Sequence, residues 1–193
     1  VGAISFMQLA PALSPSGGSG GSAWGVSIGN FDGDNRPDLA VRAFSGGTVS
    51  FFLNGSSTGS ISFSSSPSLV VTTGVSTGQN SNDVSIGDFD GDGKIDLAVS
   101  NSGDDTMSVL RNISIGIGSL SFTNRLNYTT GDSPANLVVG DMNADGKPDI
   151  AVVNGGSTVS LFRNVATVLP PVITSFNPAS GPISTTVTIT GQN

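Results

Sequence analysis

The stretch "GDFDGDGKIDLAV", residues 87–99, crowds aspartates together and follows them at once with an apolar run. Asp88, Asp90, Asp92 and Asp96 all fall within this one segment. Charges of one sign held this close repel one another, so their grouping calls for a counter-charge. The run after them, bounded by turn-forming residues, predicts a buried β-strand.

The same pattern occurs twice more, as "GNFDGDNRPDLAV" at 29–41 and "GDMNADGKPDIAV" at 140–152. The similarity extends beyond the loops. Each is preceded by a short apolar run ("WGVSIG", "NDVSIG", "ANLVVG") and followed by a strand-like segment ending in asparagine ("TVSFFLN", "TMSVLRN", "TVSLFRN"). We expect "SISF" at 60–63 and "LSF" at 120–122 to add a fourth strand, and "ISF" at 4–6 to be the same element of an earlier unit.

These repeats predict an all-β fold of three four-stranded β-propeller-type blades, forming a partial propeller with a short C-terminal β extension. Helical periodicity is absent throughout. Blades are covered on both faces by their neighbours, which suits strands that are apolar on both sides, such as "DIAVVN". The alternative is a β-sandwich with a duplicated loop, but the similarity covers nearly whole units.

The loops predict metal binding because every odd position from the first to the fifth, and the ninth, carries a side-chain oxygen. These residues are Asn30, Asp32, Asp34 and Asp38; Asp88, Asp90, Asp92 and Asp96; Asp141, Asn143, Asp145 and Asp149. The sixth position is Asn35, Gly93 or Gly146, residue types that tolerate the left-handed backbone of a sharp turn. At the seventh position we expect the backbone carbonyls of Arg36, Lys94 and Lys147 to add ligands.

Calcium is the cation that this pattern favours, with up to three ions per chain. Calcium takes six to eight oxygen ligands in flexible geometry, whereas magnesium keeps several waters and demands an octahedron. An EF-hand would need an acid at the twelfth position, where these loops have valine. The alternative is a set of asparagine- and aspartate-rich turns without metal. The second loop has the most carboxylates, so we expect it to bind most tightly.

Composition argues against several other functions. The net charge is −7 and all 14 acidic residues are aspartate, which disfavours nucleic acid as a partner. Histidine and cysteine are absent, which removes the usual zinc sites, thiol nucleophiles and histidine bases. No stretch is long and apolar enough for a membrane span. Outside the loops only Asp83, Asp104, Asp105 and Asp132 remain. We therefore expect no enzymatic activity.

At the quoted loops, the chain resembles the FG-GAP/VCBS repeat family, which includes the blades of integrin α-subunit propellers. The resemblance covers roughly residues 4–165 and departs from the family pattern at Asn30 and Asn35. It implies structural calcium between neighbouring strands of each blade. It also implies a secreted or cell-surface protein that acts in adhesion, recognition of a protein or glycan, or extracellular assembly.

The expected organisation is residues 1–169 as blades, divided at approximately 4–59, 60–119 and 120–169. Residues 170–193 form a linker and an incomplete β segment that resembles the opening of an IPT/TIG domain. The chain begins at Val1, so we expect an upstream segment that was removed or left out.

Three blades do not close a ring, because propellers have typically four to eight. The chain is therefore expected either to be part of a longer protein or to associate with further copies through its open blade edges, as a ring or a filament. Two other functions stay open: a carbohydrate-binding module using Trp24 or Tyr128, and an accessory propeller of a larger secreted enzyme. Asn54, Asn112 and Asn127 each begin a glycosylation sequon.

Overall fold

The computed structural model describes residues 23–43, 47–72, 81–167, 172–178 and 186–192, together with the single positions 13, 180 and 182. Within these residues the regular elements are all β-strands. No helix in the described part of the chain is long and apolar enough to cross a membrane. The all-β class predicted from the sequence is confirmed. The expected strand at 4–6 lies outside the described residues.

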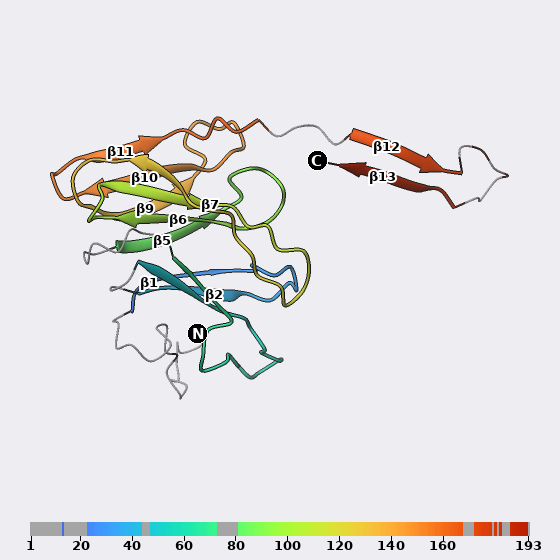
Figure 1. The fold of residues 1–193 in the computed structure, drawn as a ribbon, viewed down its shortest axis with the longest axis horizontal. Helices are drawn as coiled ribbons and strands as arrows, with labels where there is room; N and C mark the ends of the chain where they lie inside the picture. The colour runs from blue at the N-terminus through green and yellow to red at the C-terminus, as the bar shows by residue number, and fades with distance from the viewer. Residues whose placement is uncertain are drawn as a thin grey trace, which may run out of the picture.

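Three antiparallel sheets follow one another along the chain (Figure 1). The first sheet contains β1 (Ala23–Gly29), β2 (Asp38–Ala43), β3 (Thr48–Phe52) and β4 (Leu69–Thr72). The second contains β5 (Ser81–Gly87), β6 (Asp96–Asn101), β7 (Thr106–Leu110) and β8 (Leu126–Thr129). The third contains β9 (Pro134–Gly140), β10 (Asp149–Asn154) and β11 (Val159–Phe162). In each sheet the strands lie in sequence order, as in propeller blades.

The fourth strand of the first two sheets is not the one predicted. Residues 60–63 and 120–122 make only isolated bridges, such as Asn54 with Phe63 and Asn112 with Phe122. They fold back on the segment that follows β3 or β7, and the chain then returns to form β4 or β8. Phe122 instead fills the core, where its ring stacks on Phe51 at 4.8 Å.

The third sheet has three strands in the described residues, where four were predicted. The chain continues through 163–167 without regular structure. Beyond it, β12 (Val172–Asn177) and β13 (Thr188–Gln192) pair as an antiparallel hairpin, the short C-terminal extension. Figure 1 shows this hairpin reaching away from the three sheets.

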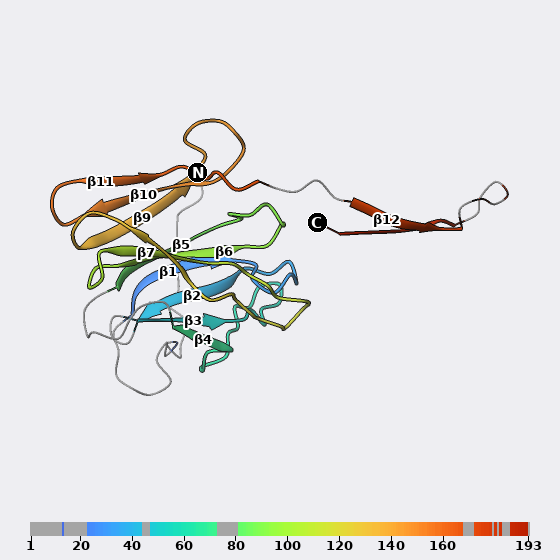
Figure 2. The same ribbon diagram turned by 45° about the horizontal axis from the view of Figure 1, so that its top comes forward.

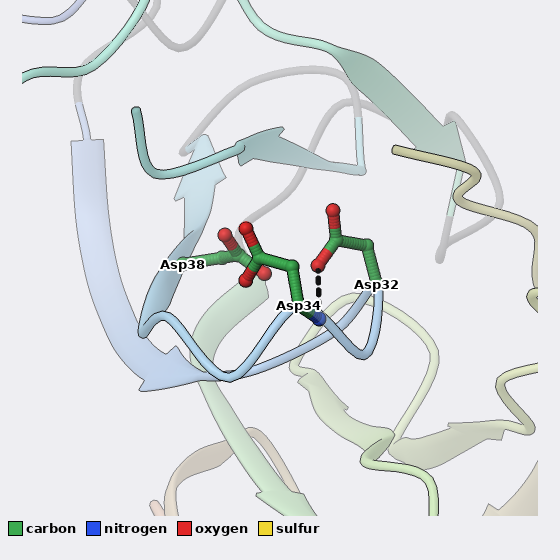
Figure 3. Close-up of side chains that lie close together, drawn as sticks. All are labelled: Asp32, Asp34 and Asp38. Atoms are coloured by element: carbon green, nitrogen blue, oxygen red, sulfur yellow. Dashed lines mark hydrogen bonds between the residues drawn. The ribbon is translucent and has the colours of Figure 1, made fainter. Parts of the chain in front are cut away.

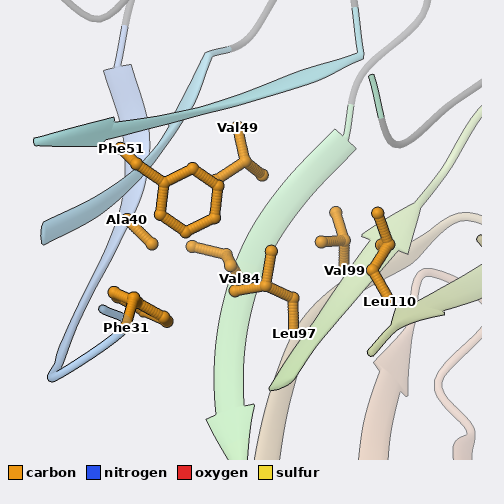
Figure 4. Packing of buried hydrophobic residues seen from close by; sticks show 8 residues of the cluster. All are labelled: Phe31, Ala40, Val49, Phe51, Val84, Leu97, Val99 and Leu110. Atoms are coloured by element: carbon orange, nitrogen blue, oxygen red, sulfur yellow. The ribbon is translucent and has the colours of Figure 1, made fainter. Parts of the chain in front are cut away.

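The sheets stack face to face in chain order, with β5 against β1 and β9 against β5 (Figure 2). Between the first and second sheets lies a core that includes Phe31, Phe51, Val84, Leu97 and Leu110 (Figure 4). A second core joins the second and third sheets and contains Ala98, Met107, Leu137, Ile150 and Val152. Each fully buried side chain of this size contributes about 1.5–3 kcal/mol. Packing between sheets therefore fixes where the aspartate loops stand.

Candidate metal centres

Each aspartate loop joins the first strand of its sheet to the second, and the ninth loop residue begins that second strand. These residues, Asp38, Asp96 and Asp149, are all buried. In each, Oδ2 accepts a hydrogen bond from the backbone N–H of the second loop residue, at 2.9–3.1 Å. In each, Oδ1 accepts one from the backbone of the asparagine after the third strand, at 2.7–2.9 Å. The ninth residue therefore ties the loop to its own sheet, and each oxygen keeps a lone pair for a cation.

The loops turn sharply at two positions. The sixth position has positive φ in all three, with values of 65° at Asn35, 83° at Gly93 and 81° at Gly146. The fourth position does too, with 81° at Gly33 and 62° at Ala144. The left-handed backbone predicted at the sixth position is thus observed, while that at the fourth was missed. Both turns direct backbone N–H groups inward, where the first loop residue accepts them.

In the first loop, Asp32, Asp34 and Asp38 place carboxylate oxygens within 4.8 Å of one another (Figure 3). Asp32 is only 5% exposed, and its Oδ2 accepts a hydrogen bond from the Gly118 backbone at 2.8 Å. Gly118 belongs to the second repeat, so this loop is held by its neighbour. Asn30, at the first position, turns its side-chain oxygen to the Gly33 N–H at 2.9 Å.

In the second loop, Asp88, Asp90 and Asp96 form the corresponding group, again within 4.8 Å. Asp92, the fourth predicted acid, points instead to two cations. Its Oδ2 is 3.1 Å from Lys94 Nζ and 3.0 Å from Arg111 Nη2. Arg111 also pairs with Asp90. One side chain from the end of β7 therefore neutralises part of this loop.

The third loop is the most open. Asp141, Asn143 and Asp145 are exposed, and only Asp149 is buried. Asn143 Nδ2 donates to Asp145 Oδ2 at 3.0 Å, while Asp141 accepts the backbone N–H groups of Asp145 and Gly146. Among the described residues, close groups of three carboxylates occur in the first and second loops. Asparagine at the third position leaves this loop one acid fewer than the second loop.

The seventh residue of each loop was predicted to offer its carbonyl. The structure shows its other backbone group in use: the N–H groups of Arg36, Lys94 and Lys147 donate to the fifth-position aspartate at 2.7–3.0 Å. Two of their side chains pair with the same fifth-position aspartate: Arg36 Nη1 is 3.6 Å from Asp34 Oδ2, and Lys94 Nζ is 3.1 Å from Asp92 Oδ2. Lys147 Nζ instead reaches the Ala166 carbonyl at 2.5 Å.

Burial and neighbours shift several pKa values in opposite directions. Burial raises the pKa of Asp96 to about 6, although two backbone hydrogen bonds act to lower it. Burial also raises the pKa of Asp38. Burial alone would raise the pKa of Asp92, but hydrogen bonds from Lys94 and Arg111 outweigh it and lower that pKa. The hydrogen bond from Asn143 lowers the pKa of exposed Asp145. A buried carboxylate with a raised pKa gains most from a nearby cation.

The donor set fits a calcium ion. Oxygens that share one ion at about 2.3–2.6 Å can be at most about 5 Å apart. The groups in the first two loops meet that limit at 4.8 Å. All their donors are oxygen, the ligand type that calcium prefers.

The asparagine that follows the third strand has a role that its sequence position did not reveal. Asn112 Nδ2 donates to the Phe31 carbonyl at 2.9 Å, and Asn164 Nδ2 to the Phe89 carbonyl at 2.8 Å. Each bond runs from one sheet into the loop of the preceding sheet. The only signal was the repeated asparagine itself. Because Asn112 is fully buried and bonded, its sequon is closed to a glycan in the folded protein.

Two of the acids outside the loops have structural partners. Asp83 Oδ2 accepts the Leu137 N–H of the next sheet at 3.2 Å. Asp105 Oδ1 accepts the Ser133 N–H at 2.7 Å, and residues 102–105 form a turn. These two residues link repeats and form no carboxylate pair.

Comparison with known proteins points to one family. The FG-GAP-like repeat matches residues 30–99 and again residues 88–152, which together cover more than half of the chain. Each match begins at one aspartate loop and ends in the strand that follows the next aspartate loop. No curated protein matches the sequence. With three loops of one geometry on three successive sheets, the chain belongs to the FG-GAP-like repeat family.

Proposed function

We propose that this chain is a calcium-stabilised recognition module of a secreted or cell-surface protein, acting in adhesion or extracellular assembly. Repeats of this family form β-propeller-type structures that generally serve recognition rather than catalysis, and they occur in extracellular proteins. The observation that carries the calcium proposal is the gathering of three carboxylates within 4.8 Å in each of two equivalent loops.

The proposed ligands are the side-chain oxygens at the first, third, fifth and ninth positions, with the seventh carbonyl. Bound calcium supplies positive charge to carboxylates that otherwise repel one another. The protein supplies the rest: the ninth aspartate ties the loop to β2, β6 or β10, and the positive-φ turns bring the other oxygens together. Metal binding then contributes directly to folding stability.

Thermal melting with calcium, with magnesium and with chelator tests the calcium proposal. We expect calcium to raise the melting temperature by several degrees over chelator, and magnesium to raise it less. Asp90→Asn should shrink the calcium effect, because Asp90 belongs to the second carboxylate group. Asp104→Asn, which removes the same charge from a turn outside the loops, is the matched control. Equal melting temperatures in calcium and chelator would contradict the proposal.

The domain limits 1–169 and 170–193, and the likeness of the tail to an IPT/TIG opening, stay proposals. Carbohydrate binding has less support than protein recognition. Tyr128 is engaged with Phe162, their ring centroids 6.1 Å apart, and Trp24 lies on a different sheet. A role as accessory propeller of a larger secreted enzyme stays a prediction that the full-length protein would test.

A further inference from the structure

The outer face of the third sheet is apolar and exposed. Strand alternation and register place five side chains on it: Val138, Ala151, Val153, Val159 and Leu161. Val153 is 50% exposed and Leu161 is 68% exposed. An antiparallel sheet with one face in water normally carries polar residues on that face. A continuous apolar face of this kind marks an interaction site.

The molecule itself shows what covers such a face. The equivalent faces of the first and second sheets each pack on the next sheet, forming the two cores. In both, the first strand of the sheet contributes a serine whose hydroxyl donates to the first strand of the next sheet. Ser27 Oγ donates to the Val84 carbonyl, and Ser85 Oγ donates to the Leu137 carbonyl. The third repeat has Val138 at this position. At this position its face is thus apolar where the first two repeats have a serine.

The first strand of each sheet ends in a glycine. Because glycine has no side chain, it leaves a hole in this surface into which a side chain of the next sheet can pack. A methyl group placed on Gly29 would lie 2.8 Å from the Ile86 side chain, and one on Gly87 would lie 3.0 Å from the Val139 side chain. On Gly140 it would meet nothing within 4 Å. Ile86 and Val139 therefore fill holes on the sheets before them, and the third hole is open.

The first sheet carries the opposite half of the same contact. Val26 and Ile28 of β1 correspond to Val84 and Ile86 of β5. Val84 and its third-repeat equivalent Leu137 are each 2% exposed, because a preceding sheet covers them, whereas Val26 is 60% and Ile28 62% exposed. The stack of three sheets thus has the hole at Gly140 on one end. On the other end it has Ile28, which is equivalent to the side chains that fill such holes.

We propose that the outer face of the third sheet binds the β1 face of a second copy of this chain, with Ile28 of that copy seated over Gly140. The contact is head-to-tail, so a second identical contact closes a two-copy ring when the rotation permits. Two copies supply six sheets, within the range of about four to eight found in propellers. The proposal rests on the partial-propeller architecture and is independent of calcium.

The test is the mass of the 193-residue chain in solution, measured by light scattering across a concentration series, in calcium and in chelator. We expect twice the chain mass of 19.3 kDa. Gly140→Leu fills the hole and should give a monomer whose melting temperature no longer depends on protein concentration. Gly116→Leu, at another glycine with open space around it, should stay dimeric. Ile28→Asp should also be monomeric, and mixing it with Gly140→Leu should restore a dimer through the one intact pair of faces.

Three outcomes overturn the proposal. A wild-type monomer at all concentrations in both buffers means that no second copy binds, and a polymer means that the ring does not close. If Ile28→Asp stays dimeric while Gly140→Leu does not, the contact joins two third sheets instead. A dimer in chelator as well as in calcium would leave this inference standing even where the calcium proposal had failed.

Discussion

Asn112 and Phe31 lie 81 residues apart in the chain, yet the Asn112 side-chain amide donates a hydrogen bond to the Phe31 carbonyl at 2.9 Å. Phe31 is the second residue of the first aspartate loop, and Asn112 follows the third strand of the second sheet. The same side chain also donates to the Ile95 carbonyl at 3.1 Å. One amide therefore ties two successive loops together.

Replacing this amide should cost substantial stability. We expect Asn112→Ala to lower the free energy of unfolding by about 2–3 kcal/mol, because two carbonyls lose their buried donor. Asn54→Ala is the matched control. Among the residues that the structure describes, its amide donates only to the Pro37 carbonyl of its own repeat, at 2.7 Å, so its loss should cost about 1 kcal/mol. Chemical denaturation in calcium measures both, and equal costs would contradict a link between sheets.

A strained position in the third loop should respond in the opposite direction. Ala144 has φ of 62°, where the other two loops have glycine. A left-handed conformation costs a residue with a side chain roughly 1–2 kcal/mol. Glycine removes this cost, but the greater entropy of glycine in the unfolded chain offsets part of the gain. We expect Ala144→Gly to raise the free energy of unfolding by about 0.5–1 kcal/mol in a denaturation experiment. A loss of stability would show that the alanine is not strained there.

Arg111 occupies oxygens that a cation would need, since it pairs with Asp90 and Asp92. We expect Arg111→Leu, which introduces the residue of the first repeat, to tighten calcium binding at the second loop by about three- to tenfold. Calorimetric titration measures this affinity. Arg125→Leu removes the same charge from the segment before β8 and should have a smaller effect. Unchanged calcium affinity in Arg111→Leu would mean that Arg111 does not compete with calcium for these carboxylates.

The raised pKa of Asp96, about 6 in the folded protein, predicts an unusual pH dependence without metal. Between its unfolded value near 3.8 and 6, the folded chain binds more protons than the unfolded chain, so stability falls as pH rises. The fall from this residue is of the order of 3 kcal/mol. Asp92 and Asp145, whose pKa values are lowered, contribute the opposite slope at lower pH.

Denaturation in chelator from pH 4 to pH 7 measures this dependence. Asp96→Asn should remove the falling component, and the difference between the two curves isolates it from the other carboxylates. In calcium the trend should reverse, because the carboxylates must be ionised to bind the metal. Parallel curves for the wild type and Asp96→Asn would contradict the assignment.

Much of the fold followed from the repeats, because loops of one pattern imply strands on either side. The aspartate positions indicated the turn, and the structure has the predicted positive φ at Gly93 and Gly146. The fourth strand was misplaced because "SISF" and "LSF" look like strands, whereas Phe122 serves the core and the sheet is completed by β4 or β8. Local pattern does not reveal which segment reaches a sheet edge.

The candidate site could be proposed from the sequence as a list of oxygens but not as an arrangement. Nothing in the local sequence shows that Asp92 turns to Arg111, a contact across 19 residues. The hydrogen bond from Gly118 to Asp32 spans 86 residues and depends on how two sheets stack. Equivalent residues of successive repeats can also differ in exposure: Val26 is exposed, whereas Val84 is buried. This difference depends on how the sheets stack, which the local sequence does not show.

The most direct test of the central claim is the amount of calcium that the metal-free chain takes up in equilibrium dialysis, measured by elemental analysis at about millimolar free calcium. Calcium binding predicts excess metal in the protein chamber of more than one and up to three ions per chain. It also predicts a loss of about one ion in the double variant Asp88→Asn, Asp90→Asn. Equal calcium concentrations on both sides of the membrane would contradict the account.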